Sequence, residues 1–345
     1  MIRLLVVEDS KTVRQALVAA FNADPQIQVV GTAENGEAAV AAARSLRPDI
    51  ITMDINMPGM NGFEATRAIM SSCPVPIVIV TGKMDPRDSA TLFRVMEAGA
   101  LMVLAKPEPP CSAGHLESVA RLVHHIKLMS EIKVVRRAFP KDAPALPVPV
   151  PLPESQTEIK VVALGASTGG PPLLQQILSR LSPQFGAAVL VVQHMADGFT
   201  ENFVHWLNQS SALPVQLAVN GMPIMPGRVY VAPDGCHLEA GPGRRIVLSS
   251  APPDNGLRPS VSCLFRSVAL SYGRQAAGVL LTGMGGDGAS GLKMLRDRGG
   301  ITIAQDRESS VVFGMPFEAI RIDAAQYILP PEGIIQLLSA LVKGR

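Results

Sequence analysis

A serine in a glycine-rich turn is the first residue of this sequence whose setting suggests chemistry. Residues 161–164 are apolar, residues 165–170 read GASTGG, and two prolines then open a segment with apolar residues at helical spacing. Proline suits the first turn of a helix, because its missing N–H would be unpaired there anyway. This order predicts a tight strand-to-helix turn with Ser167 at its apex, which is the G-x-S-x-G form of a nucleophile elbow.

The same turn is also compatible with a phosphate-binding loop, since such loops join a strand to the N-terminus of a helix. A dinucleotide site, however, has glycine at the position of Ser167 and an acid about 20 residues later. The next strand here ends instead in Gln193 and His194. A P-loop needs Gly-Lys-Ser/Thr, which the turn lacks. The turn alone therefore leaves both functions open.

His194 and Asp287 are the residues that we expect to activate Ser167. A serine hydroxyl is a weak nucleophile until a base takes its proton, and a buried carboxylate then holds the imidazole in the useful tautomer. His194 ends an apolar strand, and Asp287 lies in a second glycine-rich turn, TGMGGDG. The rival bases are His237, in a predicted hairpin, and His205, which lies in a predicted helix and is expected to pack in the interior. The rival acids are Asp197, Asp234 and Asp306.

A second group of polar residues follows the predicted strands of the N-terminal part. They are Glu8 and Asp9, Asp54, Thr81 and Lys106. Three carboxylates at one edge repel each other unless a cation lies among them, and a hard ion such as Mg²⁺ prefers oxygen ligands. A carboxylate can accept a phosphoryl group, which a lysine and a hydroxyl would then contact. The pattern predicts a phosphoryl-transfer site.

The elements that position both groups indicate an α/β protein. Strand-like runs cover residues 2–7, 27–33, 49–54, 76–82 and 100–106, and the segments 11–21, 36–46, 62–70 and 88–98 between them have helical spacing. The same alternation returns after residue 159, with a β-hairpin predicted over 236–250. We therefore predict two doubly wound domains with mainly parallel sheets, the first flavodoxin-like.

Domain limits follow from composition. We expect a first domain over residues 1–125, a helical extension and Pro-rich linker over 126–158, and a second domain over 159–345. Proline-rich segments favour extended geometry and form no core. The four cysteines are scattered without metal or disulfide spacing.

The overall composition excludes several classes. The 345 residues are 47% hydrophobic and 17% charged, with a net charge of +2. This balance gives no reason to expect a nucleic-acid partner. No apolar run is long enough for membrane insertion, so we expect a cytoplasmic protein.

Residues 1–125 resemble the response-regulator receiver domain. The matching residues are Glu8-Asp9, Asp54-Ile55-Asn56-Met57-Pro58, Gly62, Thr81 and Lys106-Pro107. The resemblance implies that a sensor histidine kinase phosphorylates Asp54. It also implies that Mg²⁺ is held by Glu8, Asp9, Asp54 and the Asn56 backbone carbonyl, and that Thr81 and Lys106 contact the phosphoryl group. Val103 stands where many receivers have an aromatic switch residue, and Glu8 where aspartate is common.

Residues 159–340 resemble the catalytic domain of the chemotaxis protein-glutamate methylesterases, the CheB family. The matching motifs are GASTGGP, QHM-DGF, VAPDG-HLE, RPSV-LFRSVA, LTGMG-DGA-GL and AQD-S-VVFGMP-EAI. The resemblance implies that Ser167 is the nucleophile, His194 the base and Asp287 its orienting acid, with backbone amides of Thr168 and Met284 as oxyanion donors. Ala196 and Ser262 depart from common family residues, and we expect neither to touch the triad.

The two resemblances together imply a phosphorylation-activated serine esterase. Its substrates would be glutamate methyl esters on the cytoplasmic helices of methylated chemoreceptors, with methanol released during chemotaxis adaptation, and it would also deamidate glutamines. The esterase reaction would need no cofactor, and the unphosphorylated receiver would obstruct the active site. The alternative is a catalytically silent receptor-binding module switched by Asp54. A DNA-binding regulator is disfavoured, because no helix-turn-helix pattern or basic face is present.

Overall fold

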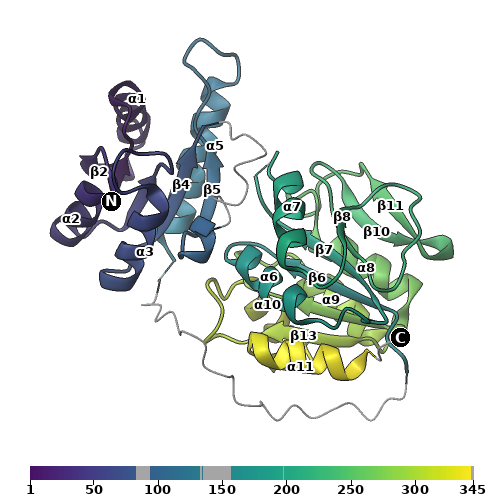
Figure 1. The fold of residues 1–345 in the computed structure, drawn as a ribbon. Coiled ribbons are helices and arrows are strands. Elements are labelled where there is room, and N and C mark those ends of the chain that lie inside the picture. Colours follow the sequence, from purple (N-terminus) through teal and green to yellow (C-terminus); the bar gives the residue numbers. More distant parts are fainter. Residues whose placement is uncertain (83–93, 133, 135–156, 197, 343–345) are drawn as a thin grey trace. The chain divides into compact units, whose positions relative to one another are not determined.

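The chain divides into two compact units, Met1–Asp142 and Ala143–Arg345, which are described separately below (Figure 1). The computed structural model describes residues 1–82, 94–132, 134, 157–196 and 198–342. Both units have a parallel sheet at their centre. The four cysteines carry free thiols, which agrees with their scattered spacing.

The first unit has a five-stranded sheet in the order β2-β1-β3-β4-β5, all parallel. Its strands are β1 Ile2–Val7, β2 Ile27–Ala33, β3 Ile50–Met53, β4 Ile77–Thr81 and β5 Met102–Ala105, and its helices are α1 Lys11–Asn22, α2 Gly36–Leu46, α3 Gly62–Ser72 and α5 His115–Ser130. This strand order is the flavodoxin-like one, as predicted. Every residue of β3 is buried, which suits a central strand covered on both faces.

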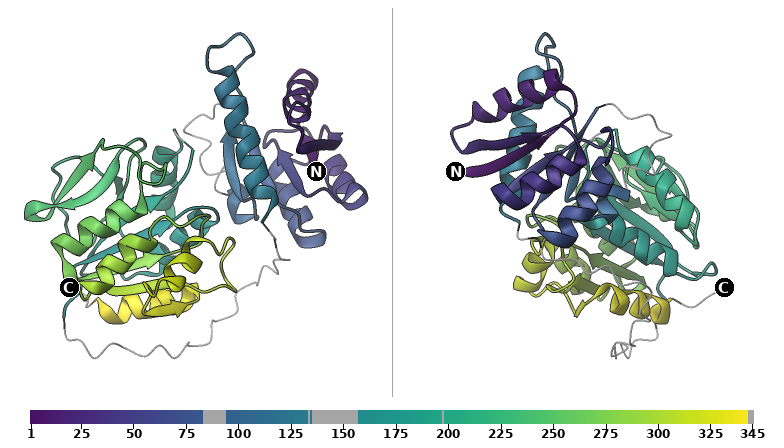
Figure 2. Two further views of the ribbon diagram at one scale, coloured as in Figure 1. Left: turned by 180° about the vertical axis from the view of Figure 1, so that it is seen from behind. Right: turned by 60° about the vertical axis from the view of Figure 1, so that its left-hand side comes forward.

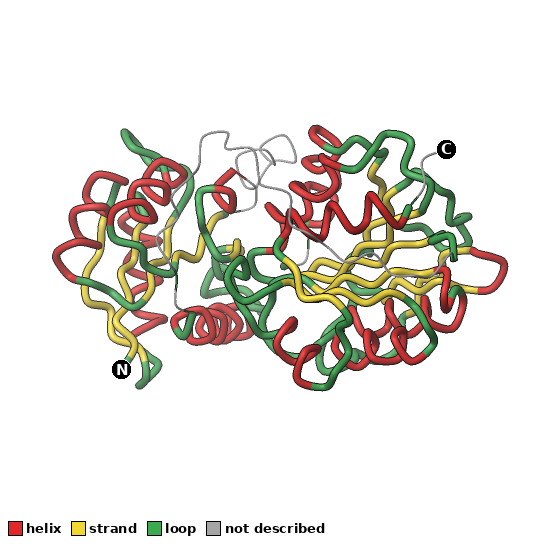
Figure 3. Tube along the Cα trace, turned by 90° about the horizontal axis from the view of Figure 1, so that it is seen from below, coloured by secondary structure: helices red, strands yellow, loops and turns green. Residues whose placement is uncertain are grey.

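The second unit has a seven-stranded sheet in the order β14-β13-β12-β6-β7-β9-β8. Its strands are β6 Val161–Ala166, β7 Ala188–Gln193, β8 Val215–Leu217, β9 Val229–Val231, β12 Ala276–Leu280, β13 Ile301–Gln305 and β14 Tyr327–Leu329, and its helices are α6 Gly170–Arg180, α7 Thr200–Ser210, α8 Val261–Ser271, α9 Ala289–Asp297, α10 Met315–Arg321 and α11 Pro331–Leu341. All its strand pairs are parallel, and helices cover both faces (Figure 3). The predicted hairpin forms a separate two-stranded sheet, β10 His237–Gly241 with β11 Arg245–Ser249 (Figure 2).

The central strand β6 marks the place where the second sheet reverses its winding. It pairs with β7 on one side and with β12 on the other. Ligands in open α/β sheets bind beyond the carboxyl ends of the strands at such a switch point. The loops that follow β6, β7 and β12 therefore meet where a site is expected.

Some elements differ from the sequence-based predictions. The short strand β14 and the seven-residue helix α10 were not predicted. Elements of this length carry too few residues for a periodic pattern to appear. Helix α5 ends at Ser130, which shortens the predicted helical extension. The segment 88–98 is helical over 94–97, and its earlier residues, like most of the predicted linker, lie outside the described residues.

Candidate active site

Ser167 directly follows β6 and lies in the predicted turn between a strand and a helix. Its N–H donates to the Thr282 carbonyl at 3.0 Å, which ties the turn to the loop after β12. Gly169 adopts φ +79°, a left-handed conformation that favours glycine, and a Cβ there would lie 2.6 Å from Val311. Helix α6 then begins at Gly170. The serine is thus held at the carboxyl edge of the sheet by a turn that needs its glycines.

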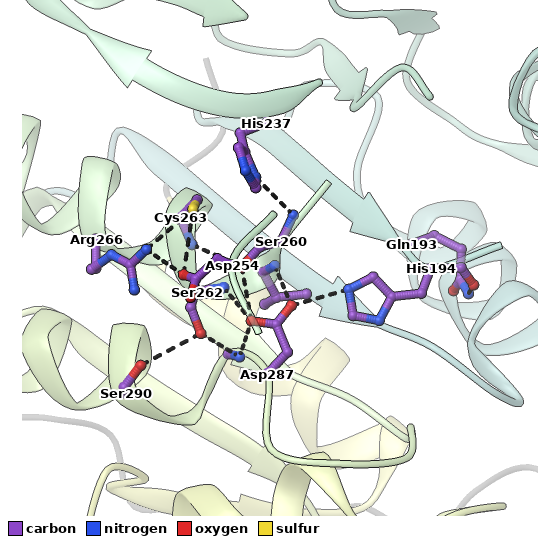
Figure 4. Close-up of polar contacts among 12 residues, drawn as sticks. Gln193, His194, His237, Asp254, Ser260, Ser262, Cys263, Arg266, Asp287 and Ser290 are labelled. Atoms are coloured by element: carbon purple, nitrogen blue, oxygen red, sulfur yellow. Dashed lines mark hydrogen bonds and ion pairs between the residues drawn. The ribbon is translucent and has the colours of Figure 1, made fainter. Parts of the chain in front are cut away.

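His194 directly follows β7, beside Ser167. Its N–H donates to the Ala166 carbonyl at 2.9 Å, which continues the ladder between β6 and β7. Its Nε2 lies 3.0 Å from Asp287 Oδ2 (Figure 4). The His194 side chain is 11% exposed and that of Asp287 is 1% exposed. The imidazole therefore has one edge against a buried carboxylate and retains some access from outside.

Asp287 is anchored at the N-terminus of α8. Its Oδ2 accepts from Val261 N at 2.7 Å, and its Oδ1 accepts from Ser262 N at 3.0 Å, from Gly288 N at 2.9 Å and from Ser260 Oγ at 2.9 Å. The first N–H groups of a helix have no partners within the helix, and they carry the positive end of its dipole. The N-terminus of α8 therefore stabilises the negative charge of the Asp287 carboxylate.

These contacts decide the charge of Asp287 and the tautomer of His194. Burial acts to raise the pKa of Asp287, but hydrogen bonds and charge attraction from His194, with hydrogen bonds from Ser262, outweigh it and hold the pKa well below 3.8. An ionised carboxylate only accepts hydrogen bonds. His194 Nε2 must therefore carry the proton, which leaves Nδ1 with a free lone pair.

The contact with Ser262 corrects an expectation. Ser262 was predicted not to touch the triad, yet its N–H binds Asp287, and its Oγ accepts from Gly288 N at 2.7 Å. Ser260, which was not predicted as a site residue, donates to Asp287 and also caps α8. A serine just before an amphipathic helix is a recognisable N-cap signal.

His237 is not placed to act as the base. It is 1% exposed, and both ring nitrogens are engaged: Nδ1 accepts from Ser260 N at 3.2 Å, and Nε2 lies 3.2 Å from the Pro252 carbonyl. A histidine with both nitrogens occupied has no lone pair for a serine proton. It supports Ser260, which in turn holds Asp287 (Figure 4).

The remaining rivals lie elsewhere. His205 is exposed on α7, so the expectation that it packs in the interior was wrong. Asp234 accepts from Gly198 N and Thr200 Oγ1, and Asp306 accepts from Ser309. Asp197 lies outside the described residues.

Two backbone N–H groups next to Ser167 are available to a ligand. Within the described part of the chain, neither Thr168 N nor Met284 N donates to another residue. Met284 follows Gly283, and a Cβ on Gly283 would lie only 2.7 Å from Ser167 Cβ. Ser167 and His194 share no hydrogen bond among the described residues, and such bonds often form only when substrate is bound. Backbone hydrogen bonds thus hold the loops that carry Ser167, His194 and Met284 at the same edge of the sheet.

The first unit gathers the predicted acidic residues at the carboxyl edge of its own sheet. Ligand oxygens of Glu8, Asp9 and Asp54 lie within 4.8 Å of one another. Lys106 Nζ lies 2.7 Å from both Glu8 Oε2 and Asp54 Oδ2. Thr81 ends β4 and is buried. The structure thus brings together four of the residues predicted to hold a metal and a phosphoryl group.

The charges of this acidic cluster shift the pKa values of two of its members. Burial and the nearby Asp54 raise the pKa of Glu8, against the lowering effect of Lys106. Burial acts to lower the pKa of Lys106, but hydrogen bonds to Asp54 and Glu8 outweigh it and raise it. Clustered carboxylate oxygens are the donor set of a hard divalent ion, so the cluster of Glu8, Asp9 and Asp54 fits Mg²⁺. Asn56 is exposed in the loop after Asp54, and the role of its carbonyl stays a prediction.

Comparisons with known proteins bear on both units. Residues 4–113 match the response regulator receiver domain family, and residues 162–338 match the CheB methylesterase family. A protein-glutamate methylesterase/protein-glutamine glutaminase of Geobacter metallireducens is 51% identical over 99% of both chains. A protein of the same description from Syntrophus aciditrophicus is 50% identical over 99% of this chain and 98% of its own.

A solved structure matches the second unit. The CheB methylesterase catalytic domain of Thermotoga maritima superposes with a TM-score of 0.52 and 39% sequence identity, covering 54% of this chain and 100% of that one. Among the helices that the structure describes, none has the length and apolar character needed to cross a membrane.

Proposed function

Because this chain belongs to the CheB methylesterase family and carries a receiver domain ahead of the esterase domain, we propose that it is a phosphorylation-activated protein-glutamate methylesterase. The substrates are glutamate methyl esters on the cytoplasmic helices of chemoreceptors, and the product is methanol. The observation that carries the proposal is the pairing of His194 Nε2 with the ionised Asp287 at 3.0 Å, beside Ser167.

The first half of the reaction forms an acyl-enzyme. His194 Nδ1 accepts the hydroxyl proton of Ser167 while Oγ attacks the ester carbonyl carbon. The negative charge that develops on the carbonyl oxygen is stabilised by the free N–H groups of Thr168 and Met284. Loss of one such donor typically costs about 3–4 kcal/mol of transition-state stabilisation. His194 then gives its proton to the departing methoxide, which leaves as methanol.

The second half releases the receptor glutamate. Water attacks the acyl-enzyme while His194 takes one of its protons, and the proton then returns to Ser167 Oγ. Asp287 stays ionised throughout, because the N-terminus of α8 stabilises its charge. Its part is to hold the tautomer and to stabilise the imidazolium that forms.

The same acyl chemistry extends to glutamine side chains. Attack of Ser167 on a primary amide gives the same acyl-enzyme, with ammonia leaving in place of methanol. The relatives from Geobacter metallireducens and Syntrophus aciditrophicus carry the double description of methylesterase and glutaminase. We include glutamine deamidation in the proposed activity. No cofactor takes part in either reaction.

The first unit supplies the control. A sensor histidine kinase donates a phosphoryl group to Asp54, and Lys106 and Thr81 contact it. Glu8, Asp9, Asp54 and the Asn56 carbonyl are the residues that would hold Mg²⁺, which when bound offsets their charge and that of the phosphoryl group. The unphosphorylated receiver restrains the esterase, and phosphorylation releases it.

The proposal also includes the organisation and location of the chain. The receiver occupies residues 1–125, the extension and linker residues 126–158, and the esterase residues 159–345. The protein acts in the cytoplasm, where the substrate helices lie. It does not bind nucleic acid, and it does not insert into the membrane.

Mass spectrometry of receptor peptides tests the activity. Methylated receptor is incubated with wild type and with Ser167→Ala, and each glutamyl site is followed. Wild type should convert methyl esters and susceptible glutamines to glutamate, and Ser167→Ala should convert neither. Equal conversion by both proteins would overturn the assignment of the nucleophile.

A further inference from the structure

Gln193 links the proposed nucleophile to the proposed base through their backbones. It is the last residue of β7 and is 6% exposed. Its Nε2 lies 2.8 Å from the Ser167 carbonyl oxygen and 2.7 Å from the carbonyl oxygen of His194. Figure 4 shows the Gln193 side chain beside His194, on the side away from Asp287. One amide group therefore bridges two residues of the triad.

The chemistry of the two partners fixes the orientation of this amide. Both are carbonyl oxygens, which only accept hydrogen bonds. Rotating the amide would put Oε1 against two other oxygens and leave no hydrogen between them. The NH₂ group must therefore face the two carbonyls, with one N–H directed to each.

The bridge continues the connection between β6 and β7 beyond the end of their ladder. The last backbone bond between these strands runs from His194 N to the Ala166 carbonyl. After it, the two chains separate into the serine turn and the histidine loop. The Ser167 carbonyl also accepts from Gly170 N at 2.9 Å. The His194 carbonyl has Gln193 as its one hydrogen-bond partner among the described residues.

The amide oxygen of Gln193 does not contribute a hydrogen bond among the described residues. Gln193 Oε1 is buried and accepts no hydrogen bond within the described part of the chain. It also restricts its neighbour, because a Cβ on Gly170 would lie 2.1 Å from Oε1. An apolar side chain of equal length would remove this unpaired acceptor, but it would also take away the hydrogen bonds to the Ser167 and His194 carbonyls. The donors of the amide remain as the reason for glutamine here.

We propose that Gln193 is a positioning residue that fixes Ser167 and His194 relative to each other through hydrogen bonds to both carbonyls. The proposal rests on the proposed esterase function. The amide contacts no reacting atom, so its removal leaves substrate binding intact and misaligns the proton transfer. Displacements of about 1 Å in such a pair reduce rates by about 100-fold.

The test compares Gln193→Met with wild type in steady-state methanol release from methylated receptor membranes. Methionine keeps the length of the side chain and removes both donors. We expect kcat, measured well below the melting temperature, to fall about 10- to 100-fold with KM within about twofold. A purely structural role would lower the melting temperature and leave the kcat of the folded variant at the wild-type value.

Two further variants keep the outcome decisive. Gln176→Met is the matched control, because Gln176 also donates its amide in a partly buried site, to Glu332, away from the triad; its kinetics should equal those of wild type. Gln193→Glu keeps the shape of the side chain and turns an acceptor toward the two carbonyls, so its kcat should also fall. If the methionine variant does not fold, the kcat of Gln193→Glu tests the positioning role.

The outcomes separate this inference from the proposed function. If a folded Gln193 variant retains the wild-type kcat, or if the loss falls on KM, Gln193 does not position the pair. If wild type itself releases no methanol beyond the level of Ser167→Ala, the esterase function fails instead.

Discussion

His194 meets Asp287 through Nε2, with 3.0 Å between Nε2 and Oδ2. In the serine-protease triad the carboxylate binds Nδ1 and the serine faces Nε2. The imidazole is reversed here, so Nδ1 is the nitrogen left for the serine proton. His194 follows β7 directly, and Asp287 is fixed on the N-terminus of α8. The proton of Ser167 is therefore transferred to Nδ1 of the imidazole instead of Nε2.

Asp287→Asn tests the tautomer. An asparagine amide can donate to Nε2, which would move the imidazole proton to Nδ1 and leave no base for Ser167. We expect kcat to fall by about 10³- to 10⁴-fold with little change in KM. Steady-state methanol release measures it. Asp297→Asn, which alters an exposed partner of Lys293, is the control and should be fully active. Near-wild-type activity of the Asp287 variant would contradict the assigned role.

The anchored carboxylate also predicts a dependence of stability on pH. The pKa of Asp287 lies below 3.8 in the folded protein, so between the two values the unfolded chain binds the extra proton. The stabilisation is therefore present above 3.8 and is lost as the pH falls below it. Urea unfolding of wild type and Asp287→Asn should give a stability difference that shrinks as the pH falls below about 4. A difference that stays constant from about pH 5 down to about pH 2 would contradict a lowered pKa of Asp287.

Gly283→Ala tests the close approach of the two loops at the nucleophile. The added Cβ would lie 2.3 Å from Met315 Sδ and 2.7 Å from Ser167 Cβ, so the serine turn must shift. We expect a loss of about 1–3 kcal/mol of stability from overpacking and a fall in kcat of about tenfold or more in the protein that remains folded.

Gly286→Ala is the matched control for that variant. It lies in the same loop, and its nearest neighbour would be Glu318 Cγ at 3.3 Å, on a side chain that can move. Melting temperature and kcat should both stay close to wild type. Equal effects of the two substitutions would show that the loop does not tolerate alanine at either position. The predicted effect of the contact between residue 283 and Ser167 would then be contradicted.

Asp54→Asn tests the acidic cluster as a phosphorylation site. Removing the carboxylate removes the phosphoryl acceptor, so labelled small-molecule phosphodonor and Mg²⁺ should leave no acid-stable, base-labile label on the variant. Chelation of Mg²⁺ should abolish labelling of wild type as well. Asp49→Asn, which changes an exposed carboxylate bound to Arg3 N, should be labelled normally. Labelling of the Asp54 variant would place the phosphoryl group on another residue.

Much of the fold was predictable, because its signals are local. Apolar runs of strand length alternate with helical spacing, and chemistry-bearing residues stand directly after strands. Parallel strands place those ends at one edge of a sheet, so the proximity of His194 to Ser167 followed from sequence alone. The strand ends likewise predicted the cluster of Glu8, Asp54 and Lys106.

The parts that were missed depend on contacts between segments far apart in sequence. Nothing local indicates that the N–H groups of α8 bind Asp287, so Ser260 was overlooked and Ser262 was wrongly excluded. The bridge made by Gln193 needs the orientation of one side chain between two turns. The burial that disqualifies His237 as a base is equally a product of packing.

Methanol release from methylated receptor membranes, with and without a small-molecule phosphodonor and Mg²⁺, tests both the esterase and its control by the receiver. Wild type, Ser167→Ala and Asp54→Ala are compared under both conditions. We predict that wild type is stimulated, that Asp54→Ala keeps only the basal rate, and that Ser167→Ala is inactive. Absence of methanol from wild type under both conditions would contradict the methylesterase function and favour a receptor-binding role.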